Sequence, residues 1–333
     1  MDSKRLSLKA AVVTVPLSSY TYEIDIPLDF CFGTMAHGGF QASMIAHTAQ
    51  QHFNTTLKDY DQPHSFNMHI IFMRPVTAGK ADLEVKDSKL GSGVSTIHVT
   101  LSQGGKERVA AYVSNMNMHA KHGASHDTNH RLVPTAAPAD VLKSSRSSEN
   151  QWIKWTFPWH AKSFFKPYTH FHFYILSNGP PHHNFTDVWI TPENNDDVFT
   201  TETLGCVADI WPQTVENHCP GSEWNTTSLV SPALRGTQTS SIDADFGFGR
   251  HPQDFRYLTL SMTLEIKKLL PPQGVKWLFT RVQAKEIKNG RMDAEMTILD
   301  ENSELLALSH HVCLVIDNAD GPLKKRERKD GKL

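Results

Sequence analysis

Residues 75–117 read PVTAGKADLEVKDSKLGSGVSTIHVTLSQGGKERVAAYVSNMN, and residues 271–317 read PPQGVKWLFTRVQAKEIKNGRMDAEMTILDENSELLALSHHVCLVID. In each stretch a proline precedes three extended segments that are separated by turns, and a glycine marks the first turn. The interval from that glycine to a later alanine is the same in both copies: Gly93 to Ala110 and Gly290 to Ala307. The chain therefore repeats one unit of antiparallel strands, and this repeat decides its fold class.

An amphipathic helix is predicted before each copy. Apolar side chains recur at helical spacing over residues 40–53 and again over residues 204–215. The second helix carries Asp209, whereas the first has no acidic residue. A duplicated unit that keeps an acid in one copy predicts a single composite active site between the two halves.

Further strands are predicted from alternating apolar and polar side chains and from the turns that bound them. In the first half they cover residues 20–32, 65–72, 81–88, 94–102 and 108–116. In the second half they cover residues 168–176, 259–264, 277–287, 291–299 and 305–316. The chain is thus predicted to be an α+β protein in which each half packs one helix against an antiparallel sheet.

The repeat also sets the predicted domain boundaries. We predict an N-terminal repeat at residues 1–118, a linker at 119–150, a C-terminal repeat at 151–320 and a basic tail at 321–333. Residues 236–256 contain glycine and lack periodicity, so they are predicted to form either a lid over a site or a disordered loop.

The composition argues against several classes of partner. Charged residues make up 20% of the chain and the net charge is −2, so there is no basic field for nucleic acid. The four cysteines and 19 histidines show no metal-ligand spacing, and no apolar run approaches the roughly 20 residues that span a bilayer. We therefore expect a soluble cytoplasmic protein with no dedicated metal site and no membrane partner.

The final residues, KKRERKDGKL, are similar to a peroxisomal address that ends in Ser-Lys-Leu, although Gly331 stands where serine belongs. A solvated charged tail is the alternative interpretation, and the sequence leaves both open.

Asp209 is the residue with the clearest chemical potential. Aspartate is unfavourable inside a helix because its side chain competes for backbone hydrogen bonds, and Pro212 should bend the helix beside it. An acid among apolar side chains is poorly solvated and can be tuned as a general base. The alternative is an aspartate on the solvated face of the helix.

The segment His37-Gly38-Gly39 opens the first predicted helix, where unpaired backbone N–H groups gather. Glycine lets a carbonyl oxygen approach the backbone closely, so the N–H of Gly39 or Phe40 is a candidate donor to a developing oxyanion. A plain tight turn before a helix explains the same glycines.

Hydroxyl and imidazole groups on two predicted strands complete the candidate site. Thr259, Ser261 and Thr263 alternate with apolar residues and so share one strand face. His310 and His311 are neighbours on the last strand, so at most one of them faces the helix. Taken singly, each of these residues is more typical of an ordinary strand hydrogen bond than of catalysis.

Together these residues are similar to those of the double-hotdog thioesterases of the acyl-CoA thioesterase II family, above all its fungal thioesterase-like branch. The resemblance covers roughly residues 20–317, apart from the linker. Its motifs in the first half are Gly38-Gly39, His64-Ser65-Phe66 and Phe72-Met73-Arg74-Pro75. In the second half they are Val188-Trp189-Ile190 and Leu204-Gly205-Cys206-Val207-Ala208-Asp209, which resembles the family's Leu-Gly-x-x-Ser-Asp run.

The resemblance implies a double hotdog, in which each of two repeats wraps an antiparallel sheet around a central helix. It also implies that Asp209 is catalytic and that a water-orienting threonine of the family falls at Ser261, or at Thr259 or Thr263 if the alignment slips by two. The family's final glutamine falls at His311, and this departure introduces a group that exchanges protons near neutral pH. Ala46 stands where single-hotdog thioesterases carry an acid, which is consistent with one site per chain.

Three hypotheses follow. The first is a hydrolase of acyl-CoA or carrier-bound acyl or polyketide thioesters, with coenzyme A or pantetheine only as part of the substrate and no further cofactor. The second is a dehydratase, isomerase or cyclase that uses Asp209 and His311 as an acid/base pair, and the third is a non-catalytic acyl-binding protein.

Candidate substrate-binding residues are His37, Thr259, Thr263 and Arg250, with Lys267 and Lys268 as further phosphate candidates. A homodimer is predicted because hotdog proteins commonly associate.

Overall fold

The computed structural model describes residues 5–121, 123–136, 151–155, 165–211, 214–218 and 255–317. The elements of the first half are, in chain order, α1 (Leu8–Ala11), β1 (Val15–Pro16), β2 (Thr21–Ile26), η1 (Leu28–Phe30), β3 (Cys31–Phe32), β4 (Met35–Ala36), α2 (Gly38–Thr55), η2 (Lys58–Tyr60), β5 (His64–Phe72), β6 (Gly79–Lys89), β7 (Val94–Gln103) and β8 (Lys106–Met116). The second half contains β9 (Trp152–Trp155), η4 (Lys166–His170), β10 (Phe171–Leu176), β11 (Phe185–Pro192), η5 (Thr201–Thr203), α3 (Leu204–Val207), η6 (Thr214–His218), β12 (Phe255–Ile266), β13 (Leu278–Gln283), β14 (Ile287–Lys288), β15 (Arg291–Leu299) and β16 (Leu305–Asp317).

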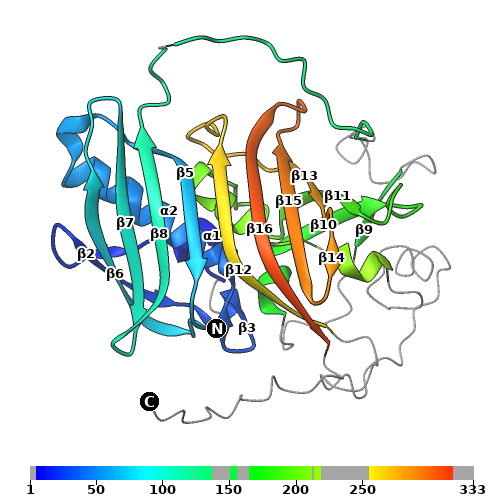
Figure 1. Cartoon of the computed structure of the whole chain (residues 1–333), viewed down its shortest axis with the longest axis horizontal. Coiled ribbons are helices and arrows are strands. Elements are labelled where there is room, and N and C mark those ends of the chain that lie inside the picture. The colour runs from blue at the N-terminus through cyan, green and yellow to red at the C-terminus, as the bar shows by residue number, and fades with distance from the viewer. Residues whose placement is uncertain are drawn as a thin grey trace, which may run out of the picture.

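The two halves share one continuous antiparallel sheet (Figure 1). Its strand order is β1-β2-β6-β7-β8-β5-β12-β16-β15-β13-β11-β10-β9, with β14 paired to β15. The halves join where β5 pairs with β12, with Met68 opposite Leu264 and Ile71 opposite Ser261. Outward from this junction, β8, β7 and β6 in one half match β16, β15 and β13 in the other. The predicted repeat is therefore visible as two similar runs of strands.

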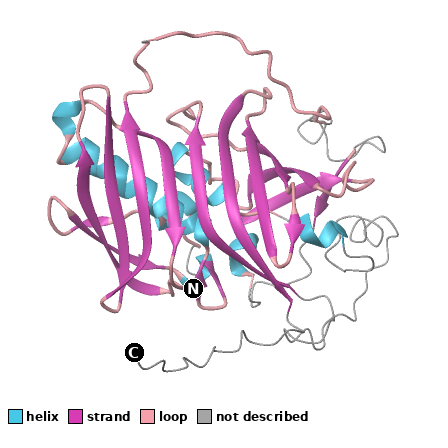
Figure 2. Ribbon diagram, in the orientation of Figure 1, coloured by secondary structure: helices cyan, strands magenta, loops and turns pink. Residues whose placement is uncertain are grey.

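The helices lie against one face of the sheet (Figure 2). Helix α2 buries the predicted apolar stripe, and its contacts extend to β5, β6, β7 and β8. Facing it, the strands bury alternate side chains, such as Leu83 and Val85 on β6 and Val109 and Val113 on β8. The predicted α+β class and the packing of a helix on an antiparallel sheet are confirmed.

The helix predicted over residues 204–215 is much shorter in the structure. Helix α3 ends at Val207, and the N–H of Asp209 reaches back only to the carbonyl of Cys206, at 3.2 Å. The carboxylate of Asp209 instead accepts a hydrogen bond from the backbone N–H of Gly39 on α2, which is a tertiary contact. The predicted bend at Pro212 lies outside the described residues.

Several predicted strands also differ at their ends. The strand predicted over residues 20–32 ends at Ile26, since Pro27 has no N–H for the ladder and a turn of 3₁₀ helix follows. In the second half, the segment predicted from residue 168 begins as a strand only at Phe171, and β13 ends at Gln283 rather than at residue 287.

Other predictions fall partly or wholly outside the described residues. These are Arg250, most of the loop at 236–256 and the basic tail at 321–333. The described part of the predicted linker, residues 119–121 and 123–136, contains no helix or strand. In the parts of the chain that the structure describes, no helix is long and apolar enough to cross a membrane.

Candidate active site

The site forms where the start of α2 meets α3, and glycines allow the two helices to touch. A Cβ on Gly39 would lie 2.6 Å from the carbonyl oxygen of Gly205 and 2.7 Å from the Cβ of Asp209. A Cβ on Gly205 would lie 2.9 Å from the Cβ of Ala42. Real Cβ atoms do not approach this closely, so the backbone contact between the halves depends on these glycines.

Asp209 follows α3 directly and points at the first turn of α2. The backbone N–H of Gly39 donates to its Oδ2 atom at 2.7 Å, and a Cβ on Gly38 would lie 2.7 Å from the same oxygen. The carboxylate side chain is 10% exposed. The positive end of the α2 dipole and the N–H bond both favour the ionised form.

His37, the residue that precedes α2, also holds the Asp209 segment. Its Nε2 atom lies 2.9 Å from the backbone carbonyl oxygen of Asp209 and 3.3 Å from Oδ2. A carbonyl oxygen can only accept, so Nε2 carries the proton and donates. On the other side of the ring, Nδ1 lies 3.9 Å from the thiol of Cys206. The predicted substrate-binding residue His37 thus contacts the carboxylate itself.

His311 approaches Asp209 from the sheet. It lies on β16 opposite Met262 of β12 and Ala294 of β15, and its side chain is fully buried, whereas His310 is exposed. Its Nδ1 atom lies 3.5 Å from Oδ1 of Asp209. The alternation predicted for the two histidines is confirmed, and the structure brings Asp209, His37 and His311 together.

The electrostatic surroundings keep Asp209 ionised. Burial by itself would raise the pKa of this carboxyl group, but the charge of His37, the imidazole of His311 and the N–H of Gly39 outweigh it. The pKa of Asp209 consequently lies below its ordinary value. The group is a carboxylate throughout the neutral pH range.

Two buried thiols near Asp209 are not nucleophiles. Burial, followed by the charge of Asp209, raises the pKa of Cys313 to about 12 and also raises the pKa of Cys206. Both thiols are therefore protonated at neutral pH, and the thiolate is the reactive form of cysteine.

The prediction that Ser261 meets Asp209 and His311 is wrong. The register of β12 against β16 shifts between Thr259 and Ser261, so a β-bulge changes which side chains face inward. After the bulge, Ser261 pairs with exposed Ile71 and Val312, and so lies on the outer face of the sheet.

The two alternatives to Ser261 lie on opposite faces. Thr263 is on the outer face, where its hydroxyl lies 2.9 Å from Nδ1 of His69. Thr259 precedes the bulge and pairs with buried Cys313, with its Oγ1 atom 3.9 Å from that sulfur. Of the three predicted hydroxyls, Thr259 is the one on the inner face.

The oxyanion prediction for Gly39 also needs correction, because its N–H is bonded to Asp209. This bond leaves Phe40 as the predicted oxyanion donor of the two, since the first N–H groups of a helix have no partner within it.

Two of the basic residues suggested for phosphate binding, Lys267 and Lys268, are engaged in ion pairs away from the site. Lys267 pairs with Glu265, and Lys268 pairs with Asp300 and Glu304. These ion pairs follow the end of β12 that is remote from the bulge. Among the described residues, no group of three or more histidine, cysteine or acidic side chains is arranged to hold a metal ion.

A cavity of about 300 Å³ is lined by residues of α2, β5, η5 and the end of β12. Ala46 of α2 lines it, and Gln50, Glu202, His64 and Met68 are among the other lining residues. The carboxylate of Glu202 accepts a hydrogen bond of 2.6 Å from Gln50. Ala46 contributes no titratable group here.

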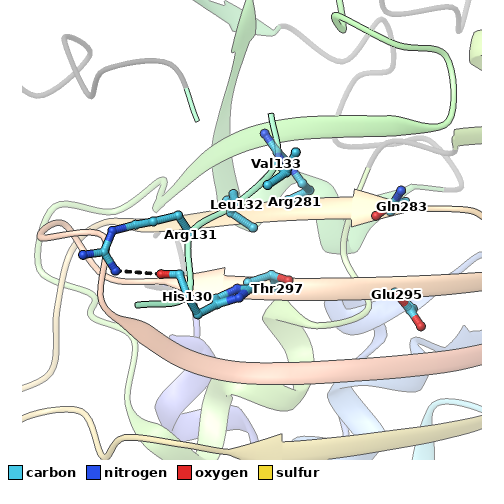
Figure 3. A pocket seen from close by; sticks show the side chains of 8 residues that line it. All are labelled: His130, Arg131, Leu132, Val133, Arg281, Gln283, Glu295 and Thr297. Atoms are coloured by element: carbon cyan, nitrogen blue, oxygen red, sulfur yellow. Dashed lines mark hydrogen bonds between the residues drawn. The ribbon is translucent and has the colours of Figure 1, made fainter. Parts of the chain in front are cut away.

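A second cavity, of about 360 Å³, lies where residues 130–133 cross β13 and β15 (Figure 3). Its lining residue Arg281 makes a buried ion pair with Asp187, donates to the carbonyl of Pro134 and stacks over the ring of Phe185. These contacts anchor the described part of the predicted linker. The cavity shares none of the residues around Asp209.

Family models match both halves of the chain. The model of the acyl-CoA thioesterase N-terminal domain matches residues 26–116, and that of the acyl-CoA thioesterase C-terminal domain matches residues 130–315. Among curated proteins, the thioesterase-like protein TwmA of Talaromyces wortmannii is 27% identical over 326 residues, which cover 90% of this chain and 89% of TwmA.

Solved structures with a similar fold include several thioesterases. A putative thioesterase II from Thermobifida fusca has a TM-score of 0.65 at 16% identity and covers 94% of this chain and 99% of its own. A hot dog fold protein from Alicyclobacillus acidocaldarius has a TM-score of 0.65 at 11% identity, covering 93% and 97%. The acyl-CoA thioesterase II TesB2 of Mycobacterium marinum has a TM-score of 0.58 at 14% identity, covering 93% and 98%. At these identities the likeness shows the fold, and the predicted double hotdog is confirmed.

Proposed function

The chain belongs to the acyl-CoA thioesterase family, and from this premise we propose that it hydrolyses an acyl thioester with water activated at Asp209. The observation that carries the proposal is the 2.7 Å hydrogen bond between the Gly39 N–H of one half and the Asp209 carboxylate of the other. It fixes a nearly buried carboxylate at the start of a helix, where a carbonyl oxygen can also be stabilised.

The proposed roles follow from the contacts. Asp209 is ionised and accepts a hydrogen bond from the attacking water, which it holds against the thioester carbon. The N–H of Phe40, at the positive end of α2, stabilises the thioester oxygen as it becomes an oxyanion. Thr259, on the inner face beside Cys313, is the strand hydroxyl that helps to orient the water.

The substrate is proposed to be an acyl or polyketide chain attached to coenzyme A or to the pantetheine of a carrier protein. Both present the same thioester and differ only beyond the pantetheine arm. No cofactor is required, because water is the only co-reactant in hydrolysis. Acyl-binding residues would lie between the helices and the sheet, where the apolar side chains of both halves face each other.

A screen over acyl-CoAs of increasing chain length tests the proposal. Release of free thiol and of the matching carboxylic acid should be found for at least one chain length, and Asp209→Asn serves as the blank. Absence of both products with every acyl-CoA and with an acylated carrier protein would refute hydrolysis.

One observation favours a second function, a dehydratase, isomerase or cyclase on a polyketide-like substrate. The imidazole of His311 lies 3.5 Å from the Asp209 carboxylate, which is a suitable arrangement for an acid/base pair. The two reactions are distinguished by their products, since hydrolysis releases the free carboxylic acid, whereas a dehydratase, isomerase or cyclase does not.

A further inference from the structure

Ser309 and His311 are two residues apart on β16, so both side chains point toward the inner face of the sheet. The Oγ atom of Ser309 lies 2.9 Å from Nε2 of His311 and 2.8 Å from the backbone carbonyl oxygen of Thr263 on β12. All three groups are within the sheet, and both side chains are buried. The imidazole is thus held by a short chain of hydrogen bonds that leads away from Asp209.

The protons in this chain can be placed by counting donors. A serine hydroxyl has one proton, and a carbonyl oxygen can only accept. Oγ lies 2.8 Å from the carbonyl oxygen, so its proton must lie between these two oxygens. Oγ then has only lone pairs for the imidazole, and Nε2 of His311 must be the donor.

This placement decides the state of the other ring nitrogen. In neutral imidazole one nitrogen carries the proton and the other is an acceptor, so Nδ1 has the lone pair. Nδ1 is buried and faces Oδ1 of Asp209 at 3.5 Å, beyond a good hydrogen bond, and it donates toward that carboxylate and lowers its pKa only once the ring is protonated. Without Ser309, the opposite tautomer would be preferred, because an Nδ1–H group could donate to the carboxylate.

We propose that Ser309 is a positioning residue that holds His311 in its Nε2–H tautomer, so that Nδ1 receives the proton of the water held by Asp209. This inference rests on the proposed thioesterase function. It assigns the proton to an atom, and it gives Asp209 the role of orienting the water and stabilising the imidazolium that forms.

The proposed step is balanced as follows. The water oxygen bonds to the thioester carbon while one water proton moves to Nδ1 of His311, and the carbonyl electrons move to the oxygen. When the intermediate collapses, the carbon–sulfur bond breaks and the leaving thiolate takes the proton from Nδ1. The products are a carboxylic acid and a free thiol, and His311 returns to its starting state.

Few other titratable groups face His311 in the described residues. Asp209 approaches from the segment after α3, with His37 beyond it at the start of α2. The ring centroid of Trp211 lies 6.5 Å from that of His311, and the register neighbours Met262 and Ala294 do not titrate. The thiols of Cys206 and Cys313 stay protonated. The charged and titratable groups around the proposed proton transfer are therefore His311, Asp209 and His37.

The tautomer can be measured without any substrate. Two-bond ¹H–¹⁵N spectra of the full-length chain labelled in its histidines distinguish Nε2–H from Nδ1–H rings, and the signals of His311 are those lost in His311→Gln. We expect an Nε2–H ring in the wild type and a shift toward Nδ1–H in Ser309→Ala. An Nδ1–H ring in the wild type, or an unchanged ring in Ser309→Ala, would overturn the inference.

The kinetic test uses whichever acyl-CoA of the chain-length panel turns over fastest. Ser309→Ala should lower kcat by about tenfold with little change in KM and should shift the acidic limb of the pH–rate profile, whereas Ser309→Thr, which keeps the hydroxyl, should restore both. Ser114→Ala is the matched control, because Ser114 is also a strand serine with one side-chain partner, Thr96. A purely structural role would change stability without moving the profile, and that result would refute the proposal.

The two measurements separate this inference from the proposed function. If no thioester is hydrolysed, the proposed function fails while the ring spectra still decide the tautomer. If hydrolysis is found and Ser309→Ala behaves as the wild type does, the function stands and the role of Ser309 is wrong.

Discussion

The carboxylate of Asp209 is nearly buried and contacts groups from both halves of the chain, the N–H of Gly39, His37 and His311. Its pKa in the folded state is lowered, so it stabilises the fold above the unfolded value of roughly 3.9, and this contribution is lost as the pH falls through the folded-state pKa. We expect Asp209→Asn to have a lower free energy of unfolding than the wild type at neutral pH, with the difference shrinking in the acid range below that value. Urea unfolding across this pH range measures the difference, and Asp82→Asn, at an exposed position on β6, is the control.

A second prediction at the scale of single residues concerns the strand hydroxyl. Because the bulge in β12 turns Thr259 inward and Ser261 outward, Thr259→Val should lower kcat for an acyl-CoA by about tenfold or more through loss of one oriented hydrogen bond. Ser261→Ala should leave kcat unchanged. The reverse result would return the role to Ser261 and remove the support for the inward orientation.

How far single residues could be predicted depended on the kind of signal. Asp209 and His311 were identified from the sequence, and they lie within 3.5 Å of each other. Ser309 was not identified, although its spacing of two from His311 places both on one strand face. Ser261 was misplaced because one extra residue in a strand reverses the inward face, and nothing in the alternation of Thr259 to Thr263 reveals it.

At the scale of elements, the site depends on the contact between α2 and α3. Gly39→Ala would place its Cβ 2.6 Å from a backbone oxygen of Gly205, where no flexible side chain can yield. We expect a loss of about 1–3 kcal/mol in the free energy of unfolding, as in other overpacked cores, together with displacement of Asp209 and loss of activity.

Gly93→Ala is the matched control, since a Cβ on Gly93 meets nothing within 4 Å. Thermal or urea unfolding of both variants checks the comparison. Equal stability of the two variants would mean that α2 and α3 can separate without cost, contrary to the close packing described here.

The order of the elements was predictable, whereas their ends were less so. Alternation and turn glycines placed the strands of both repeats, because each strand buries one face. Helix α3 was predicted too long, because apolar spacing continues past Asp209 while the aspartate side chain bonds to a different helix. That bond is tertiary, so no local pattern shows it.

At the scale of the whole molecule, the outer face of the sheet has exposed apolar side chains near the junction of the halves: Ile71, Leu258, Leu260 and Val312. Ile71 and Val312 lie on either side of Ser261 in the same row. These exposed apolar side chains, together with the common association of hotdog proteins, favour the predicted homodimer. Light scattering should give twice the mass of one chain, and the Val312→Lys variant should give a lower measured mass. A wild-type mass equal to that of one chain would refute the dimer.

The repeat predicted from the sequence extends to the whole sheet, because the pairing of β5 with β12 joins the two halves. Helices α2 and α3, one from each half, also contact each other. The composite nature of the site follows from this arrangement, since the carboxylate comes from one half and the helix start that holds it comes from the other. The most direct test is kcat for acyl-CoA hydrolysis by Asp209→Asn, measured on protein shown to be folded by its unfolding curve. The account predicts a loss of about 10²–10⁴-fold, the usual contribution of a group that activates water. A folded Asp209→Asn enzyme whose kcat equals that of the wild type would contradict it.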